Sequence, residues 1–196
     1  MKDLFIKRFQ YYKELAEKTF QQVSDEQLFW QYNEESNSIG TLVKHLAGNM
    51  QSRWTNLLTE NGEKEWRNRD SEFENDLQTK AEMLEIWDKG WLVLFEALNQ
   101  LKDENWNNSI SIRGEKITVL DAVIRQLAHY PYHIGQIVFI GKMLKNEKWK
   151  TLSIPKNKSL KSDIEHLKIQ NPAEIHENSS PVCYAKSDEV RDDYKI

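Results

Sequence analysis

The chain has 196 residues, of which 39% are hydrophobic and 30% charged, and its formal net charge at pH 7 is −4. This length suits one domain with its own hydrophobic core better than two. The acidic balance gives no basic surface of the kind that binds nucleic acid, so we expect no nucleic-acid partner.

The cysteine content and the apolar segments indicate the compartment of the protein, and the glycine and proline contents indicate its secondary structure. Cys183 is the single cysteine, which excludes a disulfide framework and is typical of a reducing compartment. The first residues lack the uninterrupted apolar stretch of a signal peptide, and no segment reaches the roughly 18 apolar residues of a membrane span. We therefore expect a cytoplasmic protein with no membrane partner. Only 7 glycines and 4 prolines favour long helices with few tight turns.

Two amphipathic segments occupy the first third of the chain. Residues 4–23 are predicted to form a helix because apolar residues recur on one face, at Phe5, Phe9, Tyr12, Leu15 and Phe20. Residues 24–27 are typical of a cap that opens a short turn. A second helix is predicted from an N-cap at Ser38 to about Leu58, followed by a stop signal at residues 60–62.

A charged segment separates the second helix from the third. Residues 61–73 are irregular in pattern, and we interpret them as a solvated surface connection with Trp66 and Phe73 as apolar anchors. A third helix is predicted over residues 75–101. We expect the tryptophans on the second and third helices to pack in the core or at the bundle ends, although an aromatic binding site is the alternative.

Alternating residues around a glycine precede the last long helix. Residues 109–112 and 116–119 alternate on either side of Arg113-Gly114-Glu115, which predicts a small hairpin. Thr118 then begins a motif that resembles a capping box. The apolar periodicity of residues 119–144 predicts the fourth helix.

Four long amphipathic helices within about 150 residues predict an all-α four-helix bundle. After residue 158 the composition changes. Residues 160–167 could form one short amphipathic helix, and the chain beyond residue 170 is rich in Ser, Asp, Glu and Lys, which is typical of a loose arm. We therefore divide the chain into a bundle of residues 1–158 and a C-terminal extension of residues 159–196.

Two histidines on the fourth helix have the spacing of metal ligands. His129 and His133 are four residues apart, so they project from one face one turn apart, as two imidazoles that share an ion require. His45 lies beside the apolar stripe of the second helix. Metal sites in bundles are built from such inward side chains on facing helices. Ordinary core-edge or surface histidines are the alternative, and Pro131 predicts a kink between the first two.

Both histidine segments resemble those of the DinB-like superfamily. The residues that carry the resemblance are Ser38–Asn49 and Gln126–Gln136, and the chain is similar in particular to an uncharacterised branch with a Ser-Ile-Pro stretch, here residues 153–155. The resemblance covers roughly residues 1 to 160. It implies a bundle of up-down-down-up type that often forms homodimers.

The same resemblance implies a site for a divalent metal ion with three histidine ligands. Matched by position, the ligands are His45, His129 and His133. Neutral imidazoles suit Zn²⁺ or Ni²⁺. Better-understood members of the superfamily include thiol S-transferases that use bacillithiol and a mycothiol-dependent maleylpyruvate isomerase.

Three histidines with an open position form a catalytic pattern, because structural zinc sites close with four protein ligands. Such an ion can lower the pKa of bound water to about 7 or hold a thiol as thiolate. No cysteine lies in the predicted bundle, so a thiol would arrive with the substrate. We expect transfer of a low-molecular-weight thiol to an electrophilic small molecule, with no catalytic residue assigned. A metal-dependent hydrolase, or a non-catalytic metal-binding or structural helical dimer, is the alternative.

Three polar residues near the predicted ligands could hydrogen-bond a ligand, a water molecule or a substrate carboxylate. Asn49 lies one turn beyond the first ligand, Arg125 one turn before the second, and Gln136 three residues beyond the third. Ordinary solvated polar side chains are the alternative. No carboxylate lies at helical spacing from the histidines, so hydrolysis would lack an obvious proton acceptor.

Overall fold

The computed structural model describes residues 1–155 and residue 158. The chain divides into a compact unit, Met1–Leu152, and a second unit that begins at Ser153. The short helix and loose arm expected in residues 159–196 lie outside the described residues, so the domain boundary at residue 158 stays a prediction. In the part of the chain that is described, no helix combines the length and the apolarity needed to cross a membrane.

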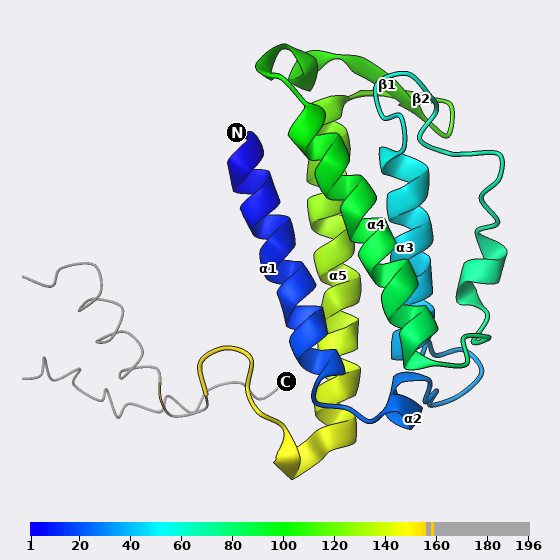
Figure 1. Ribbon diagram of the computed structural model, residues 1–196, viewed down its shortest axis with the longest axis vertical. Coiled ribbons are helices and arrows are strands. Elements are labelled where there is room, and N and C mark those ends of the chain that lie inside the picture. The colour runs from blue at the N-terminus through cyan, green and yellow to red at the C-terminus, as the bar shows by residue number, and fades with distance from the viewer. Residues whose placement is uncertain (156–157, 159–196) are drawn as a thin grey trace, which may run out of the picture. The chain divides into compact units, whose positions relative to one another are not determined.

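Four long helices form the predicted all-α bundle (Figure 1): α1 (Lys2–Phe20), α3 (Ile39–Trp54), α4 (Lys80–Gln100) and α5 (Val119–Lys145). Helices α1 and α5 run in one direction, and α3 and α4 run in the other, so the up-down-down-up order is confirmed (Figure 1). The parallel neighbours α3 and α4 require a long return connection, which residues 55–79 provide along the side of the bundle.

Polar side chains at the helix starts satisfy backbone N–H groups that have no partner within the helix. The short helix α2 (Asp25–Leu28) begins with a capping box at Ser24, and α4 begins with another at Thr79. The predicted N-cap Ser38 accepts a hydrogen bond of 3.0 Å from the N–H of Thr41. These caps set where each helix can begin.

Two predicted helix boundaries are wrong by several residues. The second helix ends at Trp54 and does not reach residue 58, because Asn56 adopts a positive φ of 51° that turns the chain away. The third helix starts after residue 79 and not at residue 75, because the N-cap Thr79 has an extended backbone. Apolar periodicity locates a helix face, whereas these local conformations decide where the helix ends.

The predicted hairpin is present as β1 (Ser109–Ile112) and β2 (Glu115–Thr118), which pair in antiparallel fashion. Arg113 and Gly114 form the two-residue turn, with φ angles of 53° and 79°. Positive φ at both positions is the pattern of a type I′ turn, which matches the twist of the two strands. Thr118 ends β2 and caps α5, since its hydroxyl accepts the N–H three residues further on at 3.1 Å.

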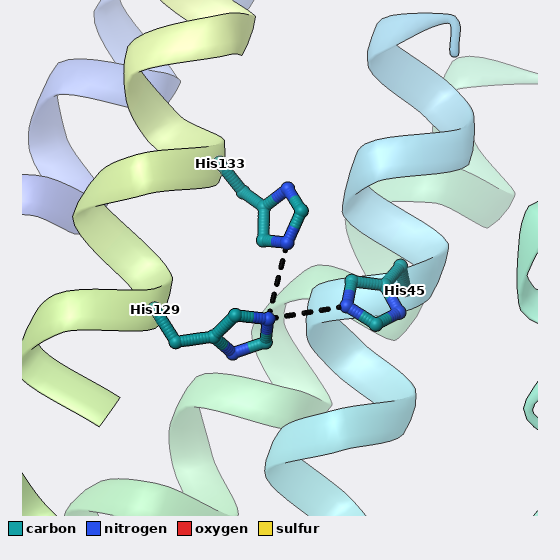
Figure 2. Close-up of side chains that lie close together, drawn as sticks. All are labelled: His45, His129 and His133. Carbon is teal, nitrogen blue, oxygen red and sulfur yellow. Dashed lines mark hydrogen bonds between the residues drawn. The ribbon is translucent and has the colours of Figure 1, made fainter. Parts of the chain in front are cut away.

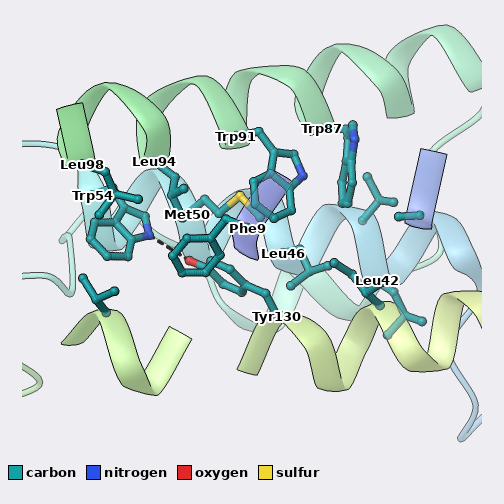
Figure 3. Packing of buried hydrophobic residues seen from close by; sticks show 14 of the residues in the cluster. Phe9, Leu42, Leu46, Met50, Trp54, Trp87, Trp91, Leu94, Leu98 and Tyr130 are labelled. Carbon is teal, nitrogen blue, oxygen red and sulfur yellow. Dashed lines mark hydrogen bonds between the residues drawn. The ribbon is translucent and has the colours of Figure 1, made fainter. Parts of the chain in front are cut away.

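Large aromatic side chains fill the centre of the bundle (Figure 3). Trp54, Trp87 and Trp91 are at most 2% exposed, which confirms the predicted core packing of the tryptophans on α3 and α4. Trp66 does not anchor the connection as predicted, because its side chain is 61% exposed. The connection instead contributes Leu57, which is 6% exposed and belongs to the core cluster.

A buried hydrogen-bond chain joins α3 to α5. The indole N–H of Trp54 donates to the hydroxyl of Tyr130 at 2.9 Å (Figure 3), and that hydroxyl donates to Oδ1 of Asn49 at 3.1 Å. Burial raises the pKa of Tyr130, so the hydroxyl keeps its proton and stays a donor. This chain fixes the distance and the register between the two helices that carry the histidines.

We predict that Tyr130→Phe lowers the free energy of unfolding by about 1–3 kcal/mol, because it leaves the Trp54 N–H and the Asn49 carbonyl buried without partners. Urea denaturation measures the change. Tyr32→Phe is the matched control, because Tyr32 is 74% exposed and the same loss of a hydroxyl should have little effect. Equal stability of the two variants would contradict the prediction.

Candidate metal centre

Three imidazole rings meet between α3 and α5 (Figure 2). Nε2 of His129 lies 3.3 Å from Nε2 of His45 and 3.1 Å from Nε2 of His133. One ring nitrogen from each residue lies within 4.8 Å of the other two, an arrangement that could hold a metal ion. The structure thus brings together the three histidines singled out from the sequence.

Helix geometry explains how α5 supplies two of these rings. His129 and His133 are one turn apart, and their ring centroids are 4.7 Å apart. Helix α5 continues without interruption through Pro131, which lies between them. His45 approaches from α3 and is buried. The antiparallel packing of α3 against α5 places its ring opposite the other two.

Each ring has a hydrogen-bond partner at its other nitrogen. Nδ1 of His45 lies 2.9 Å from the carboxylate of Glu72. The Nδ1 atoms of the two α5 histidines lie 3.3 Å and 2.8 Å from the side-chain oxygens of Gln126 and Gln136, respectively. Oxygen acceptors at Nδ1 favour the tautomer that carries its proton there. The three Nε2 lone pairs then face one another.

This donor set fits a divalent ion of the zinc type. Zinc–nitrogen bonds of about 2.0–2.1 Å in a tetrahedron put neighbouring nitrogens about 3.3 Å apart, and the two Nε2 distances are 3.1 and 3.3 Å. Imidazole nitrogens suit zinc, copper and nickel, whereas calcium and magnesium prefer oxygen ligands. Facing lone pairs repel one another, and a cation between them removes that repulsion.

The electrostatic surroundings keep the two α5 rings neutral. Burial, together with the smaller effects of the neighbouring histidines and arginines, lowers the pKa of His129 to about 3. Burial also lowers the pKa of His133, although its hydrogen bond to Gln136 opposes this. Neutral imidazole is the form that binds metal ions, so both rings are in the ligating form at neutral pH.

Glu72 is a residue of the site that the sequence reasoning missed. It belongs to the short 3₁₀ helix η1 (Asp70–Phe73) in the connection before α4 and is buried. Arg67 donates from Nε and Nη2 to both carboxylate oxygens, at 2.7 and 2.8 Å. Burial raises the pKa of Glu72, but hydrogen bonds from His45 and Arg67 outweigh it, so the net pKa lies below its ordinary value.

The interpretation of residues 61–73 as a solvated connection is therefore wrong at several positions. Lys64 and Glu72 are buried, and the side chain of Arg67 is 1% exposed. Phe73 is 40% exposed but stacks on the ring of His45, with centroids 4.7 Å apart. No helical or strand period links these residues, so the sequence pattern offered no signal for their convergence on the site.

The three polar candidates have different surroundings. Gln136 contacts a histidine of the cluster, as described above, and Asn49 belongs to the buried hydrogen-bond chain of the core. Arg125 faces the exposed pair Glu115 and Asp121 instead, with hydrogen bonds of 2.8 and 2.9 Å to the first and an ion pair of 3.0 Å to the second. The structure does not bring Arg125 to the histidines, which favours the solvated alternative at this position.

A pocket of about 450 Å³ lies between α5, α3 and the segment before α3. Leu42, Phe139 and Ile140 form its apolar walls, and Tyr132 and Gln136 also line it. None of the three histidines is among its lining residues, but Gln136 links the pocket to the cluster, since its side-chain oxygen lies 2.8 Å from Nδ1 of His133. Another cavity, of about 460 Å³ at the C-terminal ends of α3 and α4, likewise has none of the three histidines in its lining.

Comparison with known proteins gives one family match. The model of a family described as "Protein of unknown function (DUF1572)" matches residues 2–158, a span that includes all four long helices and the three histidines. No curated protein and no solved structure matches the chain.

We predict that metal-free protein loses stability as the pH falls below about 6.5, the ordinary pKa of histidine. In the unfolded chain His129 is protonated below its ordinary pKa of about 6.5. In the folded chain its pKa is about 3, so it stays neutral until the pH is much lower. This group alone lowers the free energy of unfolding by up to about 1.4 kcal/mol per pH unit in that window. Urea denaturation at pH 6.5 and 5 measures the slope. His129→Asn should reduce it, and an unchanged slope would contradict the assignment.

Proposed function

The chain belongs to the DUF1572 family of proteins of unknown function, and we propose that it is a DinB-like metalloprotein that transfers a low-molecular-weight thiol to an electrophilic small molecule. The observation that carries this proposal is the convergence of three Nε2 atoms between α3 and α5. Zn²⁺ or Ni²⁺ would be held by His45, His129 and His133.

The assignment to the DinB-like superfamily rests on two kinds of support. The segments Ser38–Asn49 and Gln126–Gln136 carry the resemblance, and both lie within the residues that the family model matches. The up-down-down-up order of the helices is the arrangement expected from the same resemblance. The two histidine segments and the order of the helices therefore both favour the DinB-like superfamily.

The number of histidines favours an open site over a closed structural one. Zinc sites with three protein ligands keep a position for a water molecule or a substrate. When bound, the ion would supply a positive charge that favours the thiolate form of an incoming thiol. The protein's own contribution is to hold three rings in place by hydrogen bonds from their Nδ1 atoms to Glu72, Gln126 and Gln136.

The pocket that Gln136 links to the cluster supports an uncharged, largely apolar electrophile as the second substrate. Its walls are formed mainly by Leu42, Phe139 and Ile140, and the described residues of its lining include no lysine or arginine that could bind an anionic group. Glu35 is the one charged residue among these described lining residues and would repel an anion. An electrophile seated there would lie next to Gln136, whose side-chain oxygen is 2.8 Å from Nδ1 of His133.

Thiol transfer is favoured over hydrolysis by the absence of a free base. Among the described residues, Glu72 is the carboxylate that contacts the cluster, and its oxygens already accept from Arg67 and His45. A thiol with an ordinary pKa near 8.5 loses its proton far more readily than water, so it needs less help from a base. Metal-dependent hydrolysis remains the second candidate chemistry.

Two further expectations belong to the same proposal. We propose a homodimer, which is supported by the exposed apolar side chains of Tyr132, Phe139 and Met143 along α5. We also propose that the protein works in the cytoplasm, where low-molecular-weight thiols are kept reduced. The single cysteine of the chain, Cys183, is consistent with such a compartment.

We predict that protein purified without a chelator contains close to one Zn or Ni ion per chain. Single substitutions His45→Ala, His129→Ala and His133→Ala should each reduce the metal content severalfold or more, because each removes a ligand. Elemental analysis of the purified variants measures this. Arg125→Ala is the control and should retain the metal, since Arg125 faces Glu115 and Asp121. Wild-type protein without metal would contradict the site.

We predict that the metal-loaded protein accelerates adduct formation between bacillithiol or glutathione and uncharged aromatic electrophiles. Mass spectrometry of the products measures the rate. The triple alanine variant of the three histidines supplies the background. If the wild-type protein binds metal but forms no adduct above this background, thiol transfer is excluded, and a panel of esters and amides then tests the hydrolase candidate.

A further inference from the structure

His45 differs from the other two histidines in the partner of its Nδ1 atom. That partner is the carboxylate of Glu72 at 2.9 Å, whereas the α5 histidines contact the amides of Gln126 and Gln136. An amide can exchange its oxygen and nitrogen by a rotation, so it can accept from or donate to a ring nitrogen. An ionised carboxylate can only accept.

We propose that Glu72 is a positioning residue that imposes the ligating tautomer on His45. Because the carboxylate accepts only, Nδ1 must carry the proton, and the Nε2 lone pair is presented to the other two rings. Gln126 and Gln136 can follow whichever tautomer their histidines adopt. This inference rests on the proposed metal site and adds to it the residue that prepares one ligand before any ion arrives.

The surroundings of His45 leave its ring little freedom. His45 and Glu72 are 4% and 5% exposed, so neither can exchange the other for water. Phe73, the neighbour of Glu72 in sequence, stacks on the imidazole with an interplanar angle of 29°. Two consecutive residues of the connection, Glu72 and Phe73, therefore restrain the His45 ring: the first at Nδ1 and the second across the ring plane.

Glu72 is itself held from two sides. Arg67 binds both carboxylate oxygens, and this two-point geometry fixes the plane of the group as well as its position. On α3, Gly48 leaves the space that the carboxylate fills, since a Cβ on Gly48 would lie 2.8 Å from Cδ of Glu72. Gly48 and Arg67 together place the carboxylate of Glu72 opposite Nδ1 of His45.

The decisive experiment replaces the carboxylate with an amide of the same shape. In Glu72→Gln, the side chain can donate as well as accept. Arg67 donates to both positions of the carboxylate, so neither orientation of the amide satisfies every contact, and in one of them the amide nitrogen faces Nδ1 of His45. In that orientation Nδ1 must accept, so the proton moves to Nε2 and blocks the ligating atom, as happens when an orienting carboxylate is replaced by an amide elsewhere. Such partners of metal ligands typically contribute 10- to 100-fold in metal affinity.

Two measurements read out the change. Long-range ¹H–¹⁵N spectra of metal-free protein report the tautomer of each histidine. We expect His45 to be protonated at Nδ1 in the wild-type protein, and the tautomer protonated at Nε2 to be populated in Glu72→Gln. Titration with Zn²⁺ should show a 10- to 100-fold loss of affinity in the variant. Glu115→Gln is the matched control, because Glu115 also binds an arginine through both carboxylate oxygens, at 2.8 and 2.9 Å from Arg125. Arg125 lies away from the three histidines, so this variant should bind zinc as the wild-type protein does.

The outcomes separate this inference from the proposed function. A wild-type His45 protonated at Nε2, or a folded Glu72→Gln variant with unchanged tautomer and zinc affinity, would overturn the role of Glu72. A wild-type protein that binds neither zinc nor nickel would instead overturn the proposed function, and the tautomer would still decide the role of Glu72. If Glu72→Gln does not fold, Gly48→Ala, which displaces the carboxylate without removing it, should produce the same loss of affinity, and wild-type affinity in that variant would count against the role.

Discussion

The close approach of three imidazole nitrogens, with Nε2 of His129 at 3.3 and 3.1 Å from the other two, is the arrangement that the surrounding structure maintains. Contacts outside the three rings hold it in place. The hydrogen-bond chain from Trp54 through Tyr130 to Asn49 ties α3 to α5 one residue away from His129. Aromatic packing in the core surrounds this hydrogen-bond chain, and all three histidines are therefore carried by long helices.

The buried pair of Arg67 and Glu72 is better explained by the site than by stability. Removing two charges from water costs several kcal/mol per ion, and their attraction often only balances that cost. An ion pair at this depth therefore adds little to the free energy of folding. Its geometry, with two hydrogen bonds from Arg67 and one from His45, instead fixes the direction in which a ring points. The connection before α4 is thereby part of the site.

Features that follow the helical period could be predicted from the sequence, whereas contacts made by the irregular connection could not. Apolar spacing located the four helices, and the i, i+4 pair His129 and His133 followed from helix geometry. Glu72 was missed because a connection without periodicity carries no signal of which side chains turn inward. Arg125 was placed near the ligands by sequence distance, but its partner Glu115 lies on β2, and a helix pattern does not reveal contacts with another element.

We propose that the three histidines bind one divalent ion and leave it an open coordination position. X-ray absorption at the zinc edge of the zinc-loaded protein tests this most directly. We predict three imidazole nitrogens at about 2.0–2.1 Å from the zinc, and a sulfur neighbour at about 2.3 Å once a thiol is added. A spectrum without imidazole scattering, or one with four protein ligands that a thiol does not change, would contradict it.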